Sequence, residues 1–262
     1  MTETPTSPPT GFRRRFVGGE RLIGTFVKTP APHPVEVLAG TGLDFVVLDE
    51  EHAPWDRGTL DVALLAARAS GIAGIVRVAE PSAARILSVL DDGAAGVLVP
   101  HVASAEKARA IAQAARFRGG RRGFSNTTRA GGFGALGLWE HVAAGDATAT
   151  VIGMIEDPEA LNEIDAILAT PGLDGVFIGR GDLTVAMGAT DMAAPEIAAA
   201  CETITAAARR AGKPVAVMVA TGEEASRFQA MGASTFIVSS DQGFMRQAAM
   251  RARADFETAL GR

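Results

Sequence analysis

Short runs rich in valine, isoleucine and phenylalanine alternate with alanine-rich helical stretches from Arg21 to the end of the chain. Such alternation is typical of βα units, in which helices join parallel strands. The pattern predicts strands over residues 22–27, 45–48, 74–78, 96–99, 150–155, 175–178, 214–219 and 235–238. Eight units within about 250 residues have the size and rhythm of an α/β fold of the (β/α)8 type, the TIM barrel.

Helices are predicted in the intervals between these strands and after the last one, over residues 34–39, 58–70, 82–90, 104–116, 158–168, 195–211, 222–231 and 243–260. A doubly wound open sheet is the alternative architecture for such a pattern. It is less favoured because no Gly-x-Gly-x-x-Gly follows the first strand.

The composition suits one large enzyme-sized domain. With 262 residues and 47% hydrophobic content, the chain can bury a barrel core, and we assign residues 16–262 to a single barrel and residues 1–15 to a disordered lead rich in Pro, Thr and Ser. A net charge of −5 with scattered basic residues argues against nucleic acid as a partner. No apolar run approaches the ~20 residues of a membrane span. A single cysteine, Cys201, allows no intrachain disulfide, which favours a reducing cytoplasm.

Polar residues collect where the predicted strands end. In a barrel, the carboxyl ends of the strands surround the active site. The residues at or just after these ends are Asp49, Glu51 and His52, then Arg77, His101, Glu156 with Asp157, and Asp182. Several strands thus end in a polar residue that a core does not require.

Glu156 and Asp182 follow neighbouring strands, which lie ~4.8 Å apart in a sheet. Their carboxylates can therefore converge on one ion, and an oxygen-only pair completed by water and substrate suits magnesium or manganese. Each could instead cap the helix that follows it. Their joint position at adjacent strand ends favours the metal site.

Two further residues suit acid/base and electrostatic roles. Arg77 lies in an apolar strand, so it needs either an internal acid such as Asp49 or an anionic oxygen that develops in a transition state. His52 is a candidate general base. Of the three lysines only Lys28 follows a strand end, so a Schiff-base mechanism has a single candidate and metal-assisted chemistry is favoured.

The longest interruption, residues 117–137, is rich in glycine and contains four arginines. Its alternatives are an ordinary surface loop and a lid over the site, and loops of this length favour the lid. Its arginines, Arg118, Arg121, Arg122 and Arg129, could meet anions.

Taken in order, several segments resemble the HpcH/HpaI aldolase family, the metal-dependent pyruvate aldolases. The matching segments are 48–54, Val76-Arg77, 89–94, Arg122-Gly123, 155–165 in part, and 175–183 in part. The resemblance covers about residues 21–255. It implies a (β/α)8 barrel that binds pyruvate through a divalent ion (Mg²⁺, Mn²⁺ or Co²⁺). It also implies a homo-oligomer, a trimer or a hexamer, with an exchanged last helix supplied by the stretch after Gly243.

Carried over residue by residue, the resemblance makes Glu156 and Asp182 the metal ligands, His52 the acid/base and Arg77 the group that stabilises the enolate. Asp91 matches an acid that raises the basicity of the histidine. The strand map puts it before the fourth strand, on the wrong side for His52, so it acts from a neighbouring subunit or the predicted boundaries are off.

The resemblance also indicates a substrate position lined by Arg77, Gly181, Asp182 and Met154. Two residues depart from the family pattern. Met154 stands where the family often has glutamine, and Arg180 in Gly179-Arg180-Gly181-Asp182 would place an extra cation beside a metal ligand.

The predicted activity is reversible cleavage of small 4-hydroxy-2-oxo acids to pyruvate and an aldehyde through a pyruvate enolate. One alternative is an acyl-CoA lyase of the citrate lyase beta or malyl-CoA lyase type, for which residues 118–129 are the only obvious cationic stretch. The other is a non-catalytic barrel that binds oxo acids. The joint presence of His52, Arg77 and the carboxylate pair argues against it, because mere binding needs no base.

Overall fold

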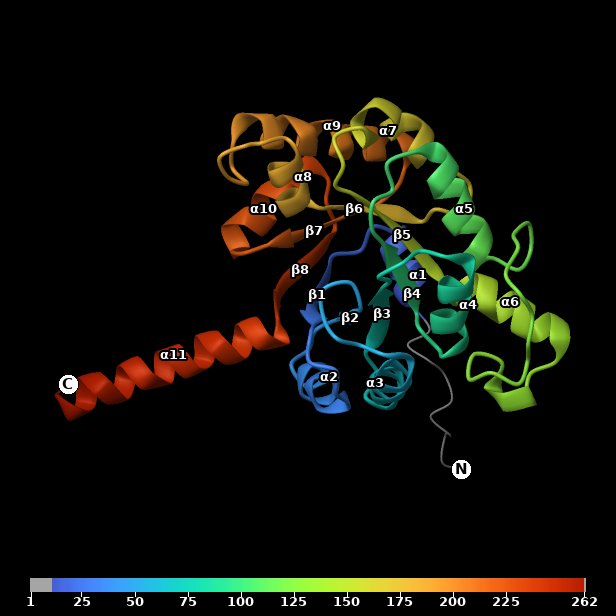
Figure 1. The fold of residues 1–262 in the computed structure, drawn as a ribbon, viewed down its shortest axis with the longest axis horizontal. Helices are drawn as coiled ribbons and strands as arrows, with labels where there is room; N and C mark the ends of the chain where they lie inside the picture. Colours follow the sequence, from blue (N-terminus) through green and yellow to red (C-terminus); the bar gives the residue numbers. More distant parts are fainter. Residues whose placement is uncertain (1–10, 262) are drawn as a thin grey trace.

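The computed structural model describes residues 11–261, in which eight parallel strands close into a barrel in sequence order (Figure 1). The predicted (β/α)8 fold is confirmed. The strands are β1 (Leu22–Val27), β2 (Phe45–Asp49), β3 (Ala73–Arg77), β4 (Gly96–Val99), β5 (Thr150–Ile155), β6 (Gly175–Ile178), β7 (Val215–Val219) and β8 (Thr235–Ser240).

The helices, apart from α1 and α11, lie around the outside of the barrel. They are α1 (Phe12–Val17), α2 (Pro32–Ala39), α3 (Arg57–Ala69), α4 (Ala83–Asp91), α5 (Ala105–Ala115), a 3₁₀ turn η1 (Gly132–Gly134), α6 (Leu138–Thr148), α7 (Ala160–Leu168), α8 (Arg180–Ala186), α9 (Pro195–Ala211), α10 (Gly222–Met231) and α11 (Asp241–Leu260). The side chains of Asp56, Ser82 and Ser104 cap the helices that follow them.

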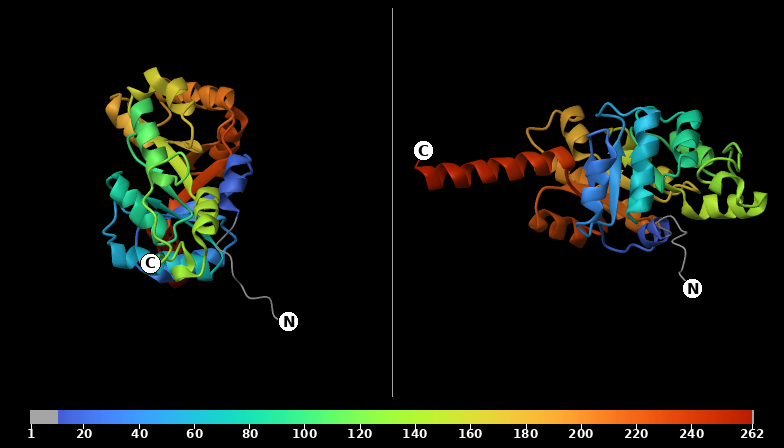
Figure 2. Two further views of the ribbon diagram at one scale, coloured as in Figure 1. Left: turned by 90° about the vertical axis from the view of Figure 1, so that its right-hand side faces the viewer. Right: turned by 90° about the horizontal axis from the view of Figure 1, so that it is seen from below.

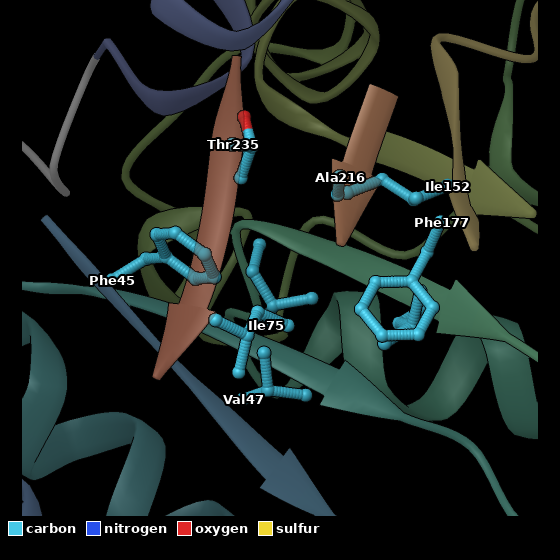
Figure 3. A pocket seen from close by; sticks show the side chains of 9 residues that line it. Phe45, Val47, Ile75, Ile152, Phe177, Ala216 and Thr235 are labelled. Carbon is cyan, nitrogen blue, oxygen red and sulfur yellow. The ribbon is translucent and has the colours of Figure 1, made fainter. Parts of the chain in front are cut away.

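The barrel interior is apolar through most of its depth. Alternate residues of each strand point inward, and these form a cluster that includes Phe45, Val47, Ile75 and Phe177 (Figure 3). The cavity among them measures only about 10 Å³, so it holds no ligand. Any binding site must lie at an end of the barrel.

Helix α1 covers the amino-terminal end of the strands, called here the base of the barrel. Phe12 and Phe16 are buried, their rings stack 5.9 Å apart, and Phe12 lies 5.2 Å from the ring of Phe45. Residues 12–15, predicted to belong to a disordered lead, are therefore helical, because two apolar residues four apart seal an open core. The rest of that lead, residues 1–10, lies outside the described residues.

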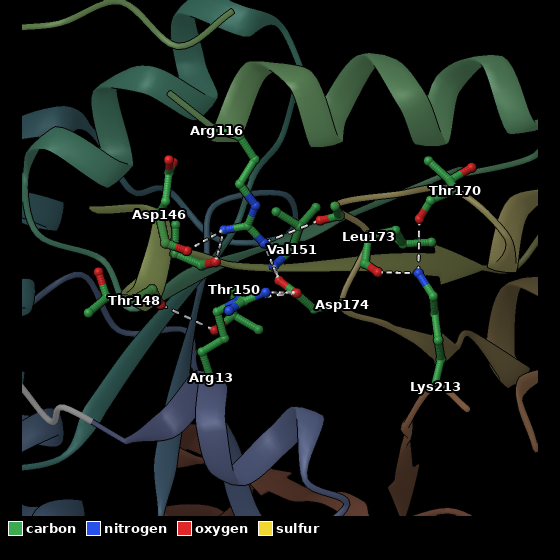
Figure 4. A network of polar contacts seen from close by, with 12 residues as sticks. Arg13, Arg116, Asp146, Thr148, Thr150, Val151, Thr170, Leu173, Asp174 and Lys213 are labelled. Atoms are coloured by element: carbon green, nitrogen blue, oxygen red, sulfur yellow. Dashed lines mark hydrogen bonds and ion pairs between the residues drawn. The ribbon is translucent and has the colours of Figure 1, made fainter. Parts of the chain in front are cut away.

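A network of polar contacts fixes the base (Figure 4). Asp174 is buried and accepts hydrogen bonds from Arg13 at 2.7 Å, from Arg116 at 2.5 Å and from the N–H of Val151 at 2.8 Å. Arg116 also donates to the carbonyl of Ala149. Each charge here has a partner, as a stable buried network requires.

The segment of residues 117–137, which lies between α5 and β5, was predicted to be a lid over the active site. It follows the carboxyl end of α5 and precedes the start of β5, so it lies at the base, opposite the carboxyl ends of the strands. The lid prediction is wrong for the site of the same subunit. The residues that follow this segment form helix α6, which was not predicted, and His141 of α6 packs between Phe117 and Phe124.

The last helix, α11, projects away from the barrel (Figures 1 and 2). Its first residue, Asp241, is its only buried one. The carboxylate of Asp241 accepts the backbone N–H groups of Lys28 and Thr29 at 2.8 and 3.1 Å, which joins the root of the helix to the end of β1. No helix within residues 11–261 has the length and apolar character needed to cross a membrane.

Candidate active site

Charged side chains replace apolar ones at the last inward positions of β2 and β3. Asp49 follows Phe45 and Val47 at a spacing of two, and Arg77 follows Ala73 and Ile75 in the same way. The two residues are direct partners in the strand register. The strand period therefore brings both side chains to one point at the carboxyl end, here called the mouth of the barrel.

Asp49 is fully buried and links three parts of the mouth. Its Oδ1 accepts from Arg77 Nε at 2.8 Å and from the backbone N–H of His52 at 3.2 Å, while Oδ2 pairs with Lys28 Nζ at 2.7 Å. Burial alone would raise the pKa of Asp49, but the hydrogen bonds and charges of Arg77 and Lys28 outweigh it and lower the pKa. Lys28 is thus committed to an ion pair, which makes it a poor Schiff-base nucleophile.

The sequence allowed Arg77 either an internal acid as its partner or an anionic ligand oxygen, and its contacts leave room for both. Besides Asp49 it contacts Glu51, with 3.2 Å between Nη1 and Oε2, and its guanidinium lies 4.7 Å from the ring centroid of Phe26. Its Nη2 group has no partner among the described residues. The guanidinium is held rigidly on one side and keeps a free donor for a ligand on the other.

His52 lies in the turn after β2 and its side chain is more than half exposed. Its Nε2 is 3.8 Å from Oε2 of Glu51, the same oxygen that contacts Arg77. Trp55, just beyond Pro54, is buried and donates to the carbonyl of Val27 at 3.2 Å, which anchors the turn to β1. The histidine is therefore accessible on a fixed loop.

Glu156 follows β5 at the next inward position and is only 2% exposed. Its Oε1 accepts the backbone N–H of His101 at 2.7 Å, an arrangement that places His101 in the left-handed region with φ of 55°. The pKa of Glu156 is raised to about 7, chiefly by burial; the N–H and the charge of His101 act to lower it, and the nearby carboxylates of Asp182 and Glu51 act to raise it. The remaining oxygen, Oε2, has no donor among the described residues.

Asp182 lies in the first turn of α8, after β6. The helix cap is Gly179, so Asp182 is not the cap; nor is Glu156, because α7 begins at Ala160 after Glu159. Both capping alternatives are wrong. A Cβ on Gly179 would lie 2.7 Å from Oε2 of Glu156, so only glycine leaves this carboxylate its present position.

The residues present fit a divalent ion. Glu156 Oε2 and the carboxylate of Asp182 have no donors in residues 11–261, and the mutual repulsion of these acids would be relieved by a cation. Within those residues no group of three or more His, Cys, Asp or Glu side chains forms a metal cluster. A metal here would be held by two carboxylates and completed by water and substrate.

The other predicted substrate residues lie near this pair or below it. Met154 is inward-facing and buried two residues before Glu156, so its thioether forms the floor below the carboxylate. The space around the Cα of Gly181 is open. Arg180 was expected to add a cation beside Asp182, but it is buried and points to Glu224, with 2.6 Å between Nη1 and Oε1. That expectation is wrong.

Asp91 lies far from the residues it was matched with. It is the last residue of α4, so it stands at the base, and its carboxylate pairs with Arg122 at 2.8 Å. His52 stands at the mouth. As the strand map predicted, one subunit does not bring the two together.

Two residues at the mouth, Glu51 and His101, were not assigned a role from the sequence, and Lys28 was considered only as a Schiff-base candidate. Glu51 contacts Arg77, and its charge acts to raise the pKa of Glu156; His101 donates its backbone N–H to Glu156 and lies 3.0 Å from Asp157 through Nδ1. Lys28 neutralises Asp49. The period of two would have placed Lys28 on the inward face of β1, after Phe26, whereas the backbone role of His101 has no sequence signal.

The whole chain was compared with known proteins. The model of the HpcH/HpaI aldolase/citrate lyase family matches residues 22–248. The chain belongs to this family. A 5-keto-4-deoxy-D-glucarate aldolase from Klebsiella pneumoniae is 34% identical over 93% of this chain and 95% of its own length.

Solved structures agree. An HpcH/HpaI aldolase/citrate lyase family protein from Burkholderia cenocepacia superposes with a TM-score of 0.89 at 26% identity, covering 95% of this chain and 99% of that one. The citrate synthase SbnG gives 0.86 at 30% identity, covering 96% and 99%. The prediction of a carbon–carbon lyase of this aldolase family is confirmed, and dependence on a divalent metal is the general property of the family.

Proposed function

We propose that the chain cleaves 4-hydroxy-2-oxo acids reversibly to pyruvate and an aldehyde, with Glu156 and Asp182 holding a divalent ion such as Mg²⁺, Mn²⁺ or Co²⁺. The observation that carries the proposal is the pairing of these two partnerless carboxylates with the free donor of Arg77 at the same mouth. When bound, the ion supplies Lewis acidity to the carboxylate and keto oxygens of the pyruvate half.

Each side chain at the mouth then has its own role in the reaction. His52 takes the proton of the 4-hydroxyl through a water molecule, the C3–C4 bond breaks, and its electron pair moves into the enolate of pyruvate. Arg77 stabilises the enolate oxygen with its Nη2 group, since Nε and Nη1 are occupied by Asp49 and Glu51. A proton returned to C3 gives pyruvate. The open space around Gly181 and the floor at Met154 are the places for the substrate.

The substrate class agrees with the name of the curated relative. Numbered from its other end, a 5-keto-4-deoxy hexarate carries a 2-oxo group, a methylene at C3 and a hydroxyl at C4. It is a 4-hydroxy-2-oxo diacid. We therefore propose polyhydroxylated diacids of this class as the first substrates to test.

The experiment is pyruvate release by a coupled assay from a panel of 4-hydroxy-2-oxo acids. Enzyme freed of metal by chelation is assayed before and after addition of Mg²⁺, Mn²⁺ or Co²⁺. Metal-dependent release supports the proposal and ranks the aldehyde halves accepted. No release with any metal or acid would contradict it, and tight pyruvate binding without turnover would favour the non-catalytic oxo-acid-binding barrel.

The acyl-CoA lyase alternative loses its main support in the structure. Its cationic stretch, residues 118–129, lies at the base, and two of its arginines are engaged: Arg122 with Asp91 and Arg129 with Asp61, at 2.8 and 2.6 Å. The same assay with a CoA thioester tests it directly, and cleavage of the thioester would restore it.

We further propose that the active form is a homo-oligomer, a trimer or hexamer, in which α11 packs on a neighbouring subunit. A 20-residue helix that buries only its first residue is marginal in water. Met245, Met250 and Phe256 are more than half exposed along it. Assembly would also allow Asp91 of one subunit to reach His52 of another.

Light scattering on the full chain and on the variants Met250→Lys and Phe256→Lys tests the assembly. We expect an oligomer for the full chain and dissociation in the variants. A monomeric full chain would contradict the proposal. We place this assembly in a reducing cytoplasm, where the buried thiol of Cys201, whose pKa burial raises to about 11, stays reduced.

A further inference from the structure

The turn from Gly179 to Asp182 carries one of the two carboxylates of the site, yet few side chains hold it. Gly179 and Gly181 have none, and α8 is only seven residues long. Within α8, only Arg180 and Leu183 are buried, while Val185 is 82% exposed. The position of Asp182 relative to Glu156 therefore depends on few anchors.

Arg180 makes contacts to two other elements. Its Nη1 lies 2.6 Å from Oε1 of Glu224 on α10, and its Nη2 donates to the carbonyl of Met218 on β7, also at 2.6 Å. The guanidinium lies 4.9 Å from the ring centroid of Phe228. A planar, bidentate donor of this kind fixes direction as well as distance.

The partner of Arg180 is itself fixed. Oε2 of Glu224 accepts the backbone N–H of Ala220 at 2.7 Å, and the backbone N–H of Glu224 donates to the capping hydroxyl of Thr221 at 3.1 Å. The hydrogen bonds thus run from the loop after β7, through Glu224 and Arg180, to the turn that carries Asp182.

We propose that Arg180 is a positioning residue that sets the place of Asp182 opposite Glu156 by tying the start of α8 to β7 and α10. The inference rests on the proposed metal-dependent function. With only two protein ligands, a small displacement of one lowers the affinity for the ion, and loss of such outer contacts typically costs about 10- to 100-fold. The residue that departs from the family pattern thus supports the site from outside.

The chain offers a matched control. Arg227 contacts the same oxygen of Glu224 at 3.6 Å and the same Phe228 ring at 5.6 Å, but it is exposed and belongs to α10 itself. Removing it changes the charge around Glu224 without freeing the turn. Arg180→Met and Arg227→Met therefore separate positioning from charge.

The experiment measures Mn²⁺ binding by calorimetry and by the electron paramagnetic resonance signal of free Mn²⁺, with thermal unfolding of the metal-free protein as the check on folding. For Arg180→Met we expect about tenfold or greater weakening of Mn²⁺ binding. For Arg227→Met we expect unchanged affinity. Arg180→Lys keeps the charge but cannot contact both Glu224 and Met218, so it should recover the affinity only in part.

A lower melting temperature with wild-type Mn²⁺ affinity in Arg180→Met would overturn the inference, since that is the result of a purely structural role. If this variant does not fold, Glu224→Gln takes its place. Glutamine can still accept the hydrogen bond from the Ala220 N–H, but it cannot form the ion pair with Arg180. Wild-type affinity in Glu224→Gln overturns the inference equally. Failure of the unmodified chain to bind Mn²⁺ would instead remove the proposed function and the inference with it.

Discussion

Two carboxylates, Asp174 and Glu156, are buried at opposite ends of the same barrel and have opposite surroundings. At the base, Asp174 accepts from two arginines and a backbone N–H. At the mouth, Glu156 receives one backbone N–H, and burial together with the acids beside it raises its pKa to about 7. Both residues are buried, at 7% and 2% exposed, and they differ most clearly in their donors. The base is built for stability, whereas the mouth keeps an unsatisfied charge for a cation.

The largest effect is expected from a substitution at the base, on the free energy of unfolding. In Asp174→Asn, Arg13 and Arg116 lose their countercharge at a buried site, so the free energy of unfolding should fall by about 3–5 kcal/mol. Urea unfolding at pH 7 measures it. The matched control is Asp165→Asn, which breaks an exposed pair with Arg210 and should cost less than about 1 kcal/mol. Equal losses in both variants would contradict the contrast drawn between the two ends.

A substitution at the mouth should lower the reaction rate more than the stability of the fold. Arg77→Ala removes the donor that we propose stabilises the enolate, and loss of such a donor lowers kcat by about 10²- to 10³-fold. Affinity for Mn²⁺ should change much less, since Glu156 and Asp182 remain. Steady-state cleavage and Mn²⁺ titration on the same preparation check both halves. Near-normal turnover would remove Arg77 from the mechanism.

Glu156→Gln should stabilise the metal-free protein at high pH. The folded-state pKa of about 7 lies above the ordinary 4.5, so this carboxyl contributes stability below pH 4.5 that is lost as the pH rises through 7. At pH 8 the variant should gain on the order of 1–3 kcal/mol over the wild type, and near pH 4, below the unfolded pKa, almost nothing. Thermal unfolding with chelator at both pH values measures this. A loss at pH 8, as expected for Asp174→Asn, would show that Glu156 serves the fold.

Most of the fold was predictable because its signal is local and repeated. Strands β4, β5 and β6 have the predicted bounds, and Arg77 and Glu156 were found because each breaks an apolar strand pattern. Helix α1 was missed, since only the closed barrel creates the opening that Phe12 and Phe16 fill. Helix α6 was missed because it directly follows a glycine-rich segment and its own apolar periodicity is weak.

The rest of the site could not be predicted because it depends on pairings between distant elements. Nothing near Arg180 in sequence indicates that Glu224, 44 residues later, is its partner. The backbone N–H of His101 that binds Glu156, 55 residues away, carries no side-chain signature. The lid was misplaced for a related reason. Its arginines suggested binding of an anionic ligand, but Arg122 and Arg129 form ion pairs with Asp91 and Asp61 of the same chain.

The smallest expected effect is the pH dependence of metal binding. A proton competes with the ion for Glu156, so affinity for Mn²⁺ should fall about tenfold for each pH unit below about 7 and level off above it. Calorimetry at pH 6 in two buffers of different ionisation enthalpy should show release of close to one proton, and at pH 8.5 close to none.

The control is the same titration on Asp182→Asn. This variant loses affinity at every pH but keeps the proton competition at Glu156, with a pKa shifted downward because one repelling charge is gone. An affinity independent of pH between 6 and 8 in the unmodified chain would mean that Glu156 is already ionised without metal. Charge and donors at the mouth would then resemble those around Asp174, and the difference between the two ends would have to come from geometry alone.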